Sequence, residues 1–249
     1  MITEPWFYAV AIPAILLMGI SKGGFGSGAG LFATPLMALA VPIPQAAAIL
    51  LPILIVMDAA GLWAYRGVFS RENMRVILVG GVVGVVLGAL TFRYFSEAWI
   101  RLLLGAIAIG FVLQRYLLPA PARPASRSTP KAIFWSACSG ITSTIAHAGG
   151  PPLSIYLLPQ RLDKRVLVGT TVIFFAVINV VKLLPYALLG LFDARNLATS
   201  LALSPLAPVG IWVGVALMRR LSERVFYSVC YALLLAVGAK LAWDGWRAL

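Results

Sequence analysis

Ten apolar segments separated by short loops constrain the fold of this 249-residue chain more than any other feature. Hydrophobic residues make up 61% of the sequence and charged residues only 11%, whereas a soluble domain has about 25% charged residues. Most of the segments approach the roughly 20 apolar residues that a helix needs to cross a bilayer. The sequence therefore predicts an all-α polytopic membrane protein. The segments cover residues 6–20, 30–41, 45–65, 76–95, 98–118, 131–147, 150–160, 166–190, 197–218 and 225–245.

Two of these segments, 30–41 and 150–160, are too short to cross a membrane. Each follows a glycine-rich break, GGFGSGAG at 23–30 in the first case and AHAGGPP at 146–152 in the second. Broken backbone at membrane depth is tolerated only where it is buried in protein or lines a cavity. We therefore expect two helical hairpins that each return to the side of the membrane from which they started.

The basic residues predict the orientation of the chain. With the N-terminus outside and both hairpins returning, four loops with clustered basic residues fall on the cytoplasmic side, as the positive-inside rule requires. The outside loops then hold only Arg93 and Arg195. Both termini are predicted outside, and the net charge of +12 reflects orientation and lipid headgroups, with no nucleic-acid partner expected. The cytoplasmic basic residues are Arg66, Arg71, Arg75, Arg115, Arg123, Arg127, Lys131, Arg161, Lys164, Arg165, Arg219, Arg220 and Arg224.

The two halves of the chain match each other in order. Gly19-Ile20-Ser21 aligns with Gly140-Ile141-Thr142 at an offset of 121 residues (140 − 19), and Asp58 aligns with Asn179 at the same offset. GVFSREN (67–73) then aligns with GLFDARN (190–196). Because the first half starts outside and the second starts inside, the sequence predicts two inverted-topology repeats. Such repeats place transport sites near the membrane midplane, where discontinuous helices meet.

Each repeat is predicted to contain one glycine-broken helical hairpin and three transmembrane helices. The first repeat covers 1–118, with the hairpin at 6–41 and spans at 45–65, 76–95 and 98–118. A cytoplasmic linker follows at 119–130. The second repeat covers 131–249, with the hairpin at 131–160 and spans at 166–190, 197–218 and 225–245.

The paired hairpins, GISKGGFGSGAGLFATPL (19–36) and GITSTIAHAGGPPLSIYLL (140–158), the duplicated halves and the length resemble the TauE/SafE family of bacterial anion exporters, also called domain of unknown function 81. The resemblance covers nearly the whole chain. It implies a multi-pass permease of the bacterial cytoplasmic (inner) membrane, not an enzyme, that exports sulfite, sulfoacetate or a related organosulfonate. No cofactor is expected, and Cys138 and Cys230 lack the spacing of metal ligands.

Three charged residues inside apolar segments are the first candidates for a functional site, because a charge at membrane depth is costly. Lys22 lies in the first break and pairs with an anion or a carboxylate, unless it reaches an interface. Lys182 lies in the middle of a span and is expected to bind the anion. Asp58 is either the counter-ion of a buried lysine or the carrier of a coupling proton.

Polar residues near these charges complete the predicted site. His147, the only histidine, lies in the second break and is a substrate contact, a proton carrier or simply a hydrogen-bonded side chain. Asn179 precedes Lys182 by three residues and lies on the same helical face. The predicted substrate-binding set is completed by Ser21, Thr142, Ser143, Gly23, Gly24, Gly149 and Gly150.

The predicted function is a secondary transporter that exports a small sulfur-containing anion by alternating access. An anion channel or a permease for another small anion is the alternative. A remote alternative is an intramembrane hydrolase with Ser27 as nucleophile and His147 as base. The expected partners are the small anion and membrane lipid, and the sequence leaves open a proton as coupling ion, a homodimer, the direction of transport and the identity of the anion.

Overall fold

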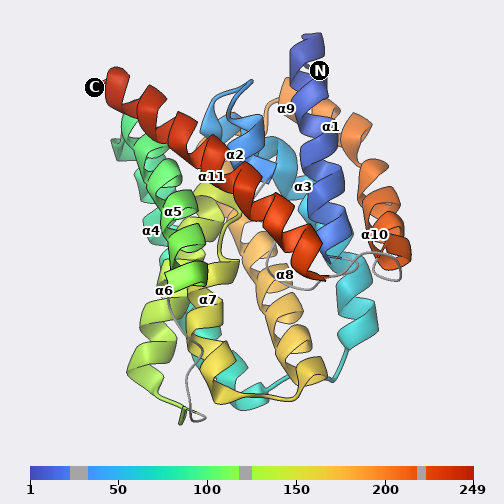
Figure 1. Cartoon of the computed structure of the whole chain (residues 1–249), viewed down its shortest axis with the longest axis vertical. Coiled ribbons are helices and arrows are strands. Elements are labelled where there is room, and N and C mark those ends of the chain that lie inside the picture. The colour runs from blue at the N-terminus through green and yellow to red at the C-terminus, as the bar shows by residue number, and fades with distance from the viewer. Residues whose placement is uncertain (23–32, 118–124, 218–222) are drawn as a thin grey trace.

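The computed structural model of the chain describes residues 1–22, 33–117, 125–217 and 223–249, and every regular element in these residues is helical (Figure 1). The helices are, in chain order, α1 (Pro5–Ile20), α2 (Ala33–Met37), α3 (Ile43–Tyr65), α4 (Arg71–Tyr94), α5 (Glu97–Leu117), α6 (Thr129–Ala146), α7 (Gly150–Leu157), α8 (Lys164–Leu188), α9 (Ala194–Leu203), α10 (Leu206–Leu217) and α11 (Glu223–Arg247), with one 3-10 turn, η3 (Leu158–Gln160), after α7.

Four helical stretches among the described residues are long and apolar enough to cross a membrane: Ile43–Trp63, Arg71–Phe92, Arg165–Leu188 and Ala194–Val213. Their outer faces carry large apolar side chains, as a lipid environment requires. On α4, for example, Val79, Val83 and Val86 are about half exposed, at 57%, 49% and 55%. The prediction of an all-α membrane protein is confirmed.

The helices pack in pairs that join distant parts of the chain. The main pairs are α4 with α6, α5 with α11, α1 with α10 and α3 with α8. Glycines permit the closest approaches: a Cβ on Gly19 of α1 would lie 2.9 Å from the Cα of Gly210 on α10, and one on Gly88 of α4 would lie 2.8 Å from the Cβ of Thr144 on α6. Small residues at such contacts are typical of membrane helix interfaces.

The second hairpin bends at His147. Helix α6 ends at Ala146, His147 adopts a left-handed backbone conformation with φ of 52°, and α7 begins at Gly150. The N–H groups of His147 and Ala148 donate to the carbonyls of Ser143 and Thr142, which closes the end of α6. The predicted break of the first hairpin, 23–30, lies outside the described residues, between the end of α1 and the start of α2.

The predicted span 197–218 corresponds to the spanning stretch Ala194–Val213, but a turn at Ser204 and Pro205 divides it into α9 and α10. Pro205 has no backbone N–H to donate and its ring conflicts with the carbonyl one turn earlier, so the helix is interrupted there. The other described helices begin or end within a few residues of the predicted segments, and α4 starts earlier than predicted, at Arg71.

Two loops fold alike before α4 and α9. Gly67 and Gly190 have left-handed backbone angles, with φ of 79° and 68°, which glycine adopts without strain. Three residues later Ser70 and Asp193 cap the following helices, because their side-chain oxygens accept from the backbone N–H groups of Asn73 and Asn196.

Candidate functional site

The first group of the candidate site is an ion pair between Lys22 and Asp58. Lys22 lies two residues after the end of α1, where the helix widens into a π-turn, and its Nζ lies 2.5 Å from Oδ1 of Asp58 in the C-terminal half of α3. The side chain of Asp58 is 6% exposed and that of Lys22 is 26% exposed. Asp58 is thus paired with a lysine, as the counter-ion role requires, and its role in function stays a prediction.

Asn179 occupies the second oxygen of the same carboxylate. Its Nδ2 donates to Oδ2 of Asp58 at 2.5 Å, and Asn179 is buried in α8. Both carboxylate oxygens therefore have a strong donor, one from the end of α1 and one from α8. This arrangement fixes the Asp58 side chain between helices that are 121 residues apart in sequence.

The second group is centred on Lys182, which is completely buried at 0% exposure. Its Nζ donates to the backbone carbonyl of Ser143 at 3.1 Å and to the hydroxyl of Ser143 at 3.2 Å, and it contacts Nδ1 of His147 at 2.9 Å. These three acceptors match the three donors of an ammonium group. None of the ion pairs formed by described residues includes Lys182.

His147 links this second group to α3. Its Nε2 lies 2.9 Å from the carbonyl oxygen of Ala47, which can only accept a hydrogen bond. We therefore assign the proton to Nε2, so that Nδ1 is the acceptor for Lys182 and the imidazole is neutral. A left-handed backbone is costly for a residue with a side chain, and such outliers cluster at functional sites.

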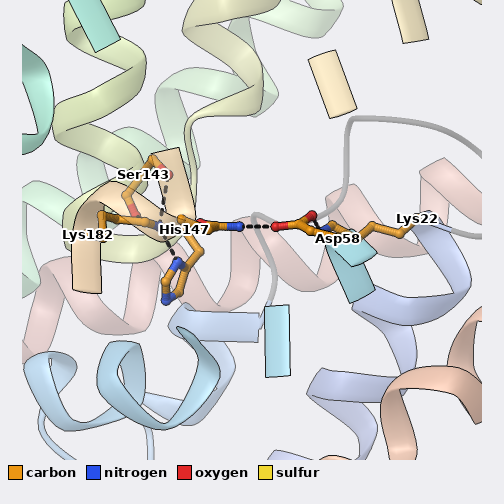
Figure 2. A network of polar contacts seen from close by, with 6 residues as sticks. Lys22, Asp58, Ser143, His147 and Lys182 are labelled. Atoms are coloured by element: carbon orange, nitrogen blue, oxygen red, sulfur yellow. Dashed lines mark hydrogen bonds and ion pairs between the residues drawn. The ribbon is translucent and has the colours of Figure 1, made fainter. Parts of the chain in front are cut away.

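The two groups form one polar cluster, because Asn179 and Lys182 lie one turn apart on α8. Figure 2 shows Lys182, Ser143 and His147 together on one side and Lys22 with Asp58 on the other. Lys22 and Asp58 compensate each other, so an ammonium at Lys182 leaves the cluster with one positive charge in excess. A buried charge without a counter-charge is expensive, and an anion would remove that cost.

The structure brings together six of the twelve predicted site residues: Lys22, Asp58, Ser143, His147, Asn179 and Lys182. Thr142 donates to the carbonyls of Cys138 and Ser139 in its own helix, at 2.9 and 3.2 Å. Gly149 accepts a hydrogen bond from the Ser139 hydroxyl at 2.7 Å, and Gly150 is the first residue of α7, so neither has a hydrogen bond to the charged cluster. Ser21 is buried at 0% exposure, while Gly23, Gly24 and Ser27 lie outside the described residues.

Sequence reasoning missed three participants. The carbonyl of Ala47 fixes the His147 tautomer, and no pattern marks a backbone group. The hydroxyl of the buried Tyr186 donates to the Thr144 carbonyl at 2.5 Å, and its position four residues after Lys182 was a usable signal. Thr34, in the short helix α2, is also buried, with a side chain that has no hydrogen-bond partner.

This combination of apolar spanning helices, a helix break and a buried charged cluster defines a helical membrane protein with a polar site of the kind that transporters use. A comparison with protein-family models gives the family. The model described as Sulfite exporter TauE/SafE matches residues 11–241, nearly the whole chain, and the protein belongs to this family. Family membership indicates a membrane exporter of sulfite or another anion. Searches of curated proteins and of solved structures found no match.

Proposed function

We propose that the protein is a secondary transporter that exports a small sulfur-containing anion, such as sulfite, sulfoacetate or a related organosulfonate, across the bacterial cytoplasmic membrane. The observation that carries this proposal is the state of Lys182. It is buried, it has only neutral acceptors around it, and the nearby acid is already paired with Lys22. With Lys182 protonated, the cluster lacks one negative charge, which a bound anion supplies.

Binding of the anion would exchange acceptors around Lys182. The Ser143 hydroxyl and the neutral imidazole of His147 are weaker partners for an ammonium than a sulfite or sulfonate oxygen. When an anion oxygen takes the place of the Ser143 hydroxyl, that hydroxyl is free to donate to the substrate. Asn179 and the Lys22–Asp58 pair hold the opposite side of the cluster in place during this exchange.

The inverted repeats remain part of the proposal, with repeats at 1–118 and 131–249 and a linker at 119–130. The packing of the helices supports this division. On the alignment of the halves, α1 corresponds to α6, α3 to α8, α4 to α9 and α10 together, and α5 to α11. The first arm of each hairpin then packs on a helix of the other repeat, α1 on α10 and α6 on α4. The matched helices α3 and α8 pack on each other, and so do α5 and α11. A pseudo-two-fold arrangement predicts this interleaving.

Two amide pairs give further support for alternating access. Asn73 Nδ2 donates to Gln160 Oε1 at 3.0 Å, and Gln45 Nε2 donates to Asn196 Oδ1 at 2.9 Å. Each asparagine lies in the first turn of the helix that follows a matched loop, and the glutamines lie at the end of the second hairpin and at the start of α3, just after the first hairpin. One pair closes each end of the cluster, and opening of an end requires its pair to separate.

The orientation is proposed from the sequence and is compatible with the fold. The N- and C-termini lie at the same end of the molecule (Figure 1), as an arrangement with both termini outside requires. The Asn196 pair lies at this end, since Ile2 near the N-terminus donates to Thr199 at 2.9 Å. The Asn73 pair then lies at the cytoplasmic end, beside Arg71 and Arg75.

Export needs no further energy source in this scheme, because an inside-negative potential drives a monovalent anion outward with about 2.3 kcal/mol per 100 mV. Proton coupling through Asp58 is an additional hypothesis, which an imposed pH gradient at fixed potential tests.

An anion channel is the alternative function. The hydrolase with Ser27 and His147 has little support, because both ring nitrogens of His147 are already engaged, by Ala47 and Lys182.

The experiment is potential-driven sulfite flux in liposomes that contain the purified protein. Lys182→Met removes the charge and nearly preserves the size of the side chain, and a roughly hundredfold loss of flux is expected. The matched control is Lys240→Met, because Lys240 is exposed and pairs with Asp244 on the surface. Sulfite flux that persists in Lys182→Met would contradict the proposed site, and wild-type protein without any anion flux would contradict the proposed function.

A further inference from the structure

Two buried hydroxyl groups among the described residues have no hydrogen-bond partner, Ser21 Oγ and Thr34 Oγ1. Both residues are 0% exposed. A buried hydroxyl without a partner carries a desolvation penalty that native structures rarely leave uncompensated. These two unpaired groups therefore need an explanation. A bound ligand that accepts their hydrogen bonds is the explanation that the rest of the site favours.

Other buried hydroxyls in the described helices behave differently. Ser136 donates to the Ile133 carbonyl at 3.2 Å, and Thr171 donates to the Leu167 carbonyl at 2.9 Å. Bonds of this kind to the preceding turn are the ordinary way in which serine and threonine are satisfied within a helix. Ser21 follows α1 and Thr34 lies in the first turn of α2, and neither makes such a bond.

Residues close in sequence to the two hydroxyls pack in an apolar cluster that contains residues of the second hairpin. Ile20 precedes the buried serine and Leu36 follows the buried threonine by two residues, and both pack against the apolar cluster that includes Ala146 and Ala148. These two alanines flank His147, the acceptor for the buried ammonium. The first hairpin thus brings unpaired hydroxyl donors toward the second hairpin, which holds the acceptors of the Lys182 ammonium.

We propose that the hydroxyls of Ser21 and Thr34 donate hydrogen bonds to oxygens of the transported anion and make the site selective for oxyanions. This inference rests on the proposed function and adds Thr34 to the site. An ammonium attracts any anion, whereas two directional hydroxyl donors favour an anion with several acceptor oxygens, such as a sulfite or a sulfonate, over a spherical halide. The hydroxyls, from the first hairpin, and Lys182, from α8, would contact different oxygens of one anion.

The test compares Ser21→Ala and Thr34→Val, alone and combined, with two control variants, Ser136→Ala and Thr171→Val. The melting temperature of the purified protein is measured in detergent with and without sulfite, and the half-saturating sulfite concentration is measured in liposomes. Each site variant is expected to raise that concentration about tenfold, as loss of a hydrogen bond to a charged group does. Without sulfite the site variants should melt at or above the wild-type temperature, because they remove an unpaired group, whereas the controls should melt lower.

Competition by chloride distinguishes a loss of oxyanion selectivity from a general loss of anion binding. In the combined variant the half-saturating concentration of chloride, measured by competition with sulfite, should stay within about twofold of wild type, since chloride offers no oxygen to lose. An unchanged half-saturating sulfite concentration in the combined variant would overturn this inference while leaving the proposed function standing. A lower melting temperature without ligand would also overturn it, because the hydroxyls would then be structural. A wild-type protein that neither transports sulfite nor is stabilised by it would overturn both.

Discussion

Removal of the Asp58 charge tests the electrostatic organisation of the cluster most directly. Asp58→Asn preserves the shape of the side chain but leaves Lys22 without its counter-ion and adds a second uncompensated positive charge. Breaking a fully buried ion pair costs about 3–5 kcal/mol, and since Lys22 is 26% exposed we expect about 2–3 kcal/mol here. For a chain of this size that corresponds to a fall in melting temperature of roughly 4–12 °C.

The double variant Lys22→Gln/Asp58→Asn tests whether the two charges interact. It removes both charges together, so its melting temperature should return to within about 4 °C of wild type, whereas Lys22→Gln alone should destabilise the protein because Asp58 is then buried with only Asn179. The control is Lys240→Gln, which removes an exposed Lys–Asp pair and should change stability by less than about 1 kcal/mol. Single and double variants whose effects simply add would refute the reasoning, because the two charges would then not interact.

Three further sets of substitutions have defined outcomes. Glycine and asparagine at position 147 should tolerate the left-handed backbone better than alanine, in the variants His147→Gly, His147→Asn and His147→Ala. Only the asparagine variant retains an acceptor and should keep measurable sulfite flux. Equal flux in all three variants would contradict a role for the side chain. A cysteine introduced at Ser143, in a background without native cysteines, should be labelled faster in Asn73→Ala and in Asn196→Ala. The faster labelling should occur from opposite sides of the membrane in the two variants, and faster labelling from the same side in both would count against paired end closures. Asn179→Asp should abolish sulfite flux, since a second carboxylate cancels the excess positive charge, and full activity would argue that the charge balance is irrelevant.

The membrane-embedded charges were predictable from the sequence, because the cost of a charge in lipid is the same wherever the helix packs. Lys22, Asp58 and Lys182 all stood out in apolar runs for this reason. The sequence did not show which lysine takes the carboxylate. That choice depends on the placement of the end of α1 beside α3, which the packing of α1 with α2 and α10 determines.

The contacts of His147 show a second limit of the sequence. Its tautomer depends on the carbonyl of Ala47, 100 residues away, and a backbone carbonyl leaves no mark in a pattern of side chains. Thr34 was missed for a related reason. A single hydroxyl in an apolar stretch is normally satisfied by its own helix, and only the three-dimensional structure shows that this one is not.

The polarity of the site follows from a difference between positions that the repeat alignment matches. Asp58 and Asn179 align at an offset of 121 residues, and they contact each other across α3 and α8. Two aspartates there would repel at 2.5 Å and would neutralise both lysines, whereas two asparagines would leave two positive charges without any acid. One acid and one amide give a strong hydrogen bond and exactly one unmatched lysine. If the two halves are repeats, as proposed, this difference between matched positions is what would favour an anion in the cluster.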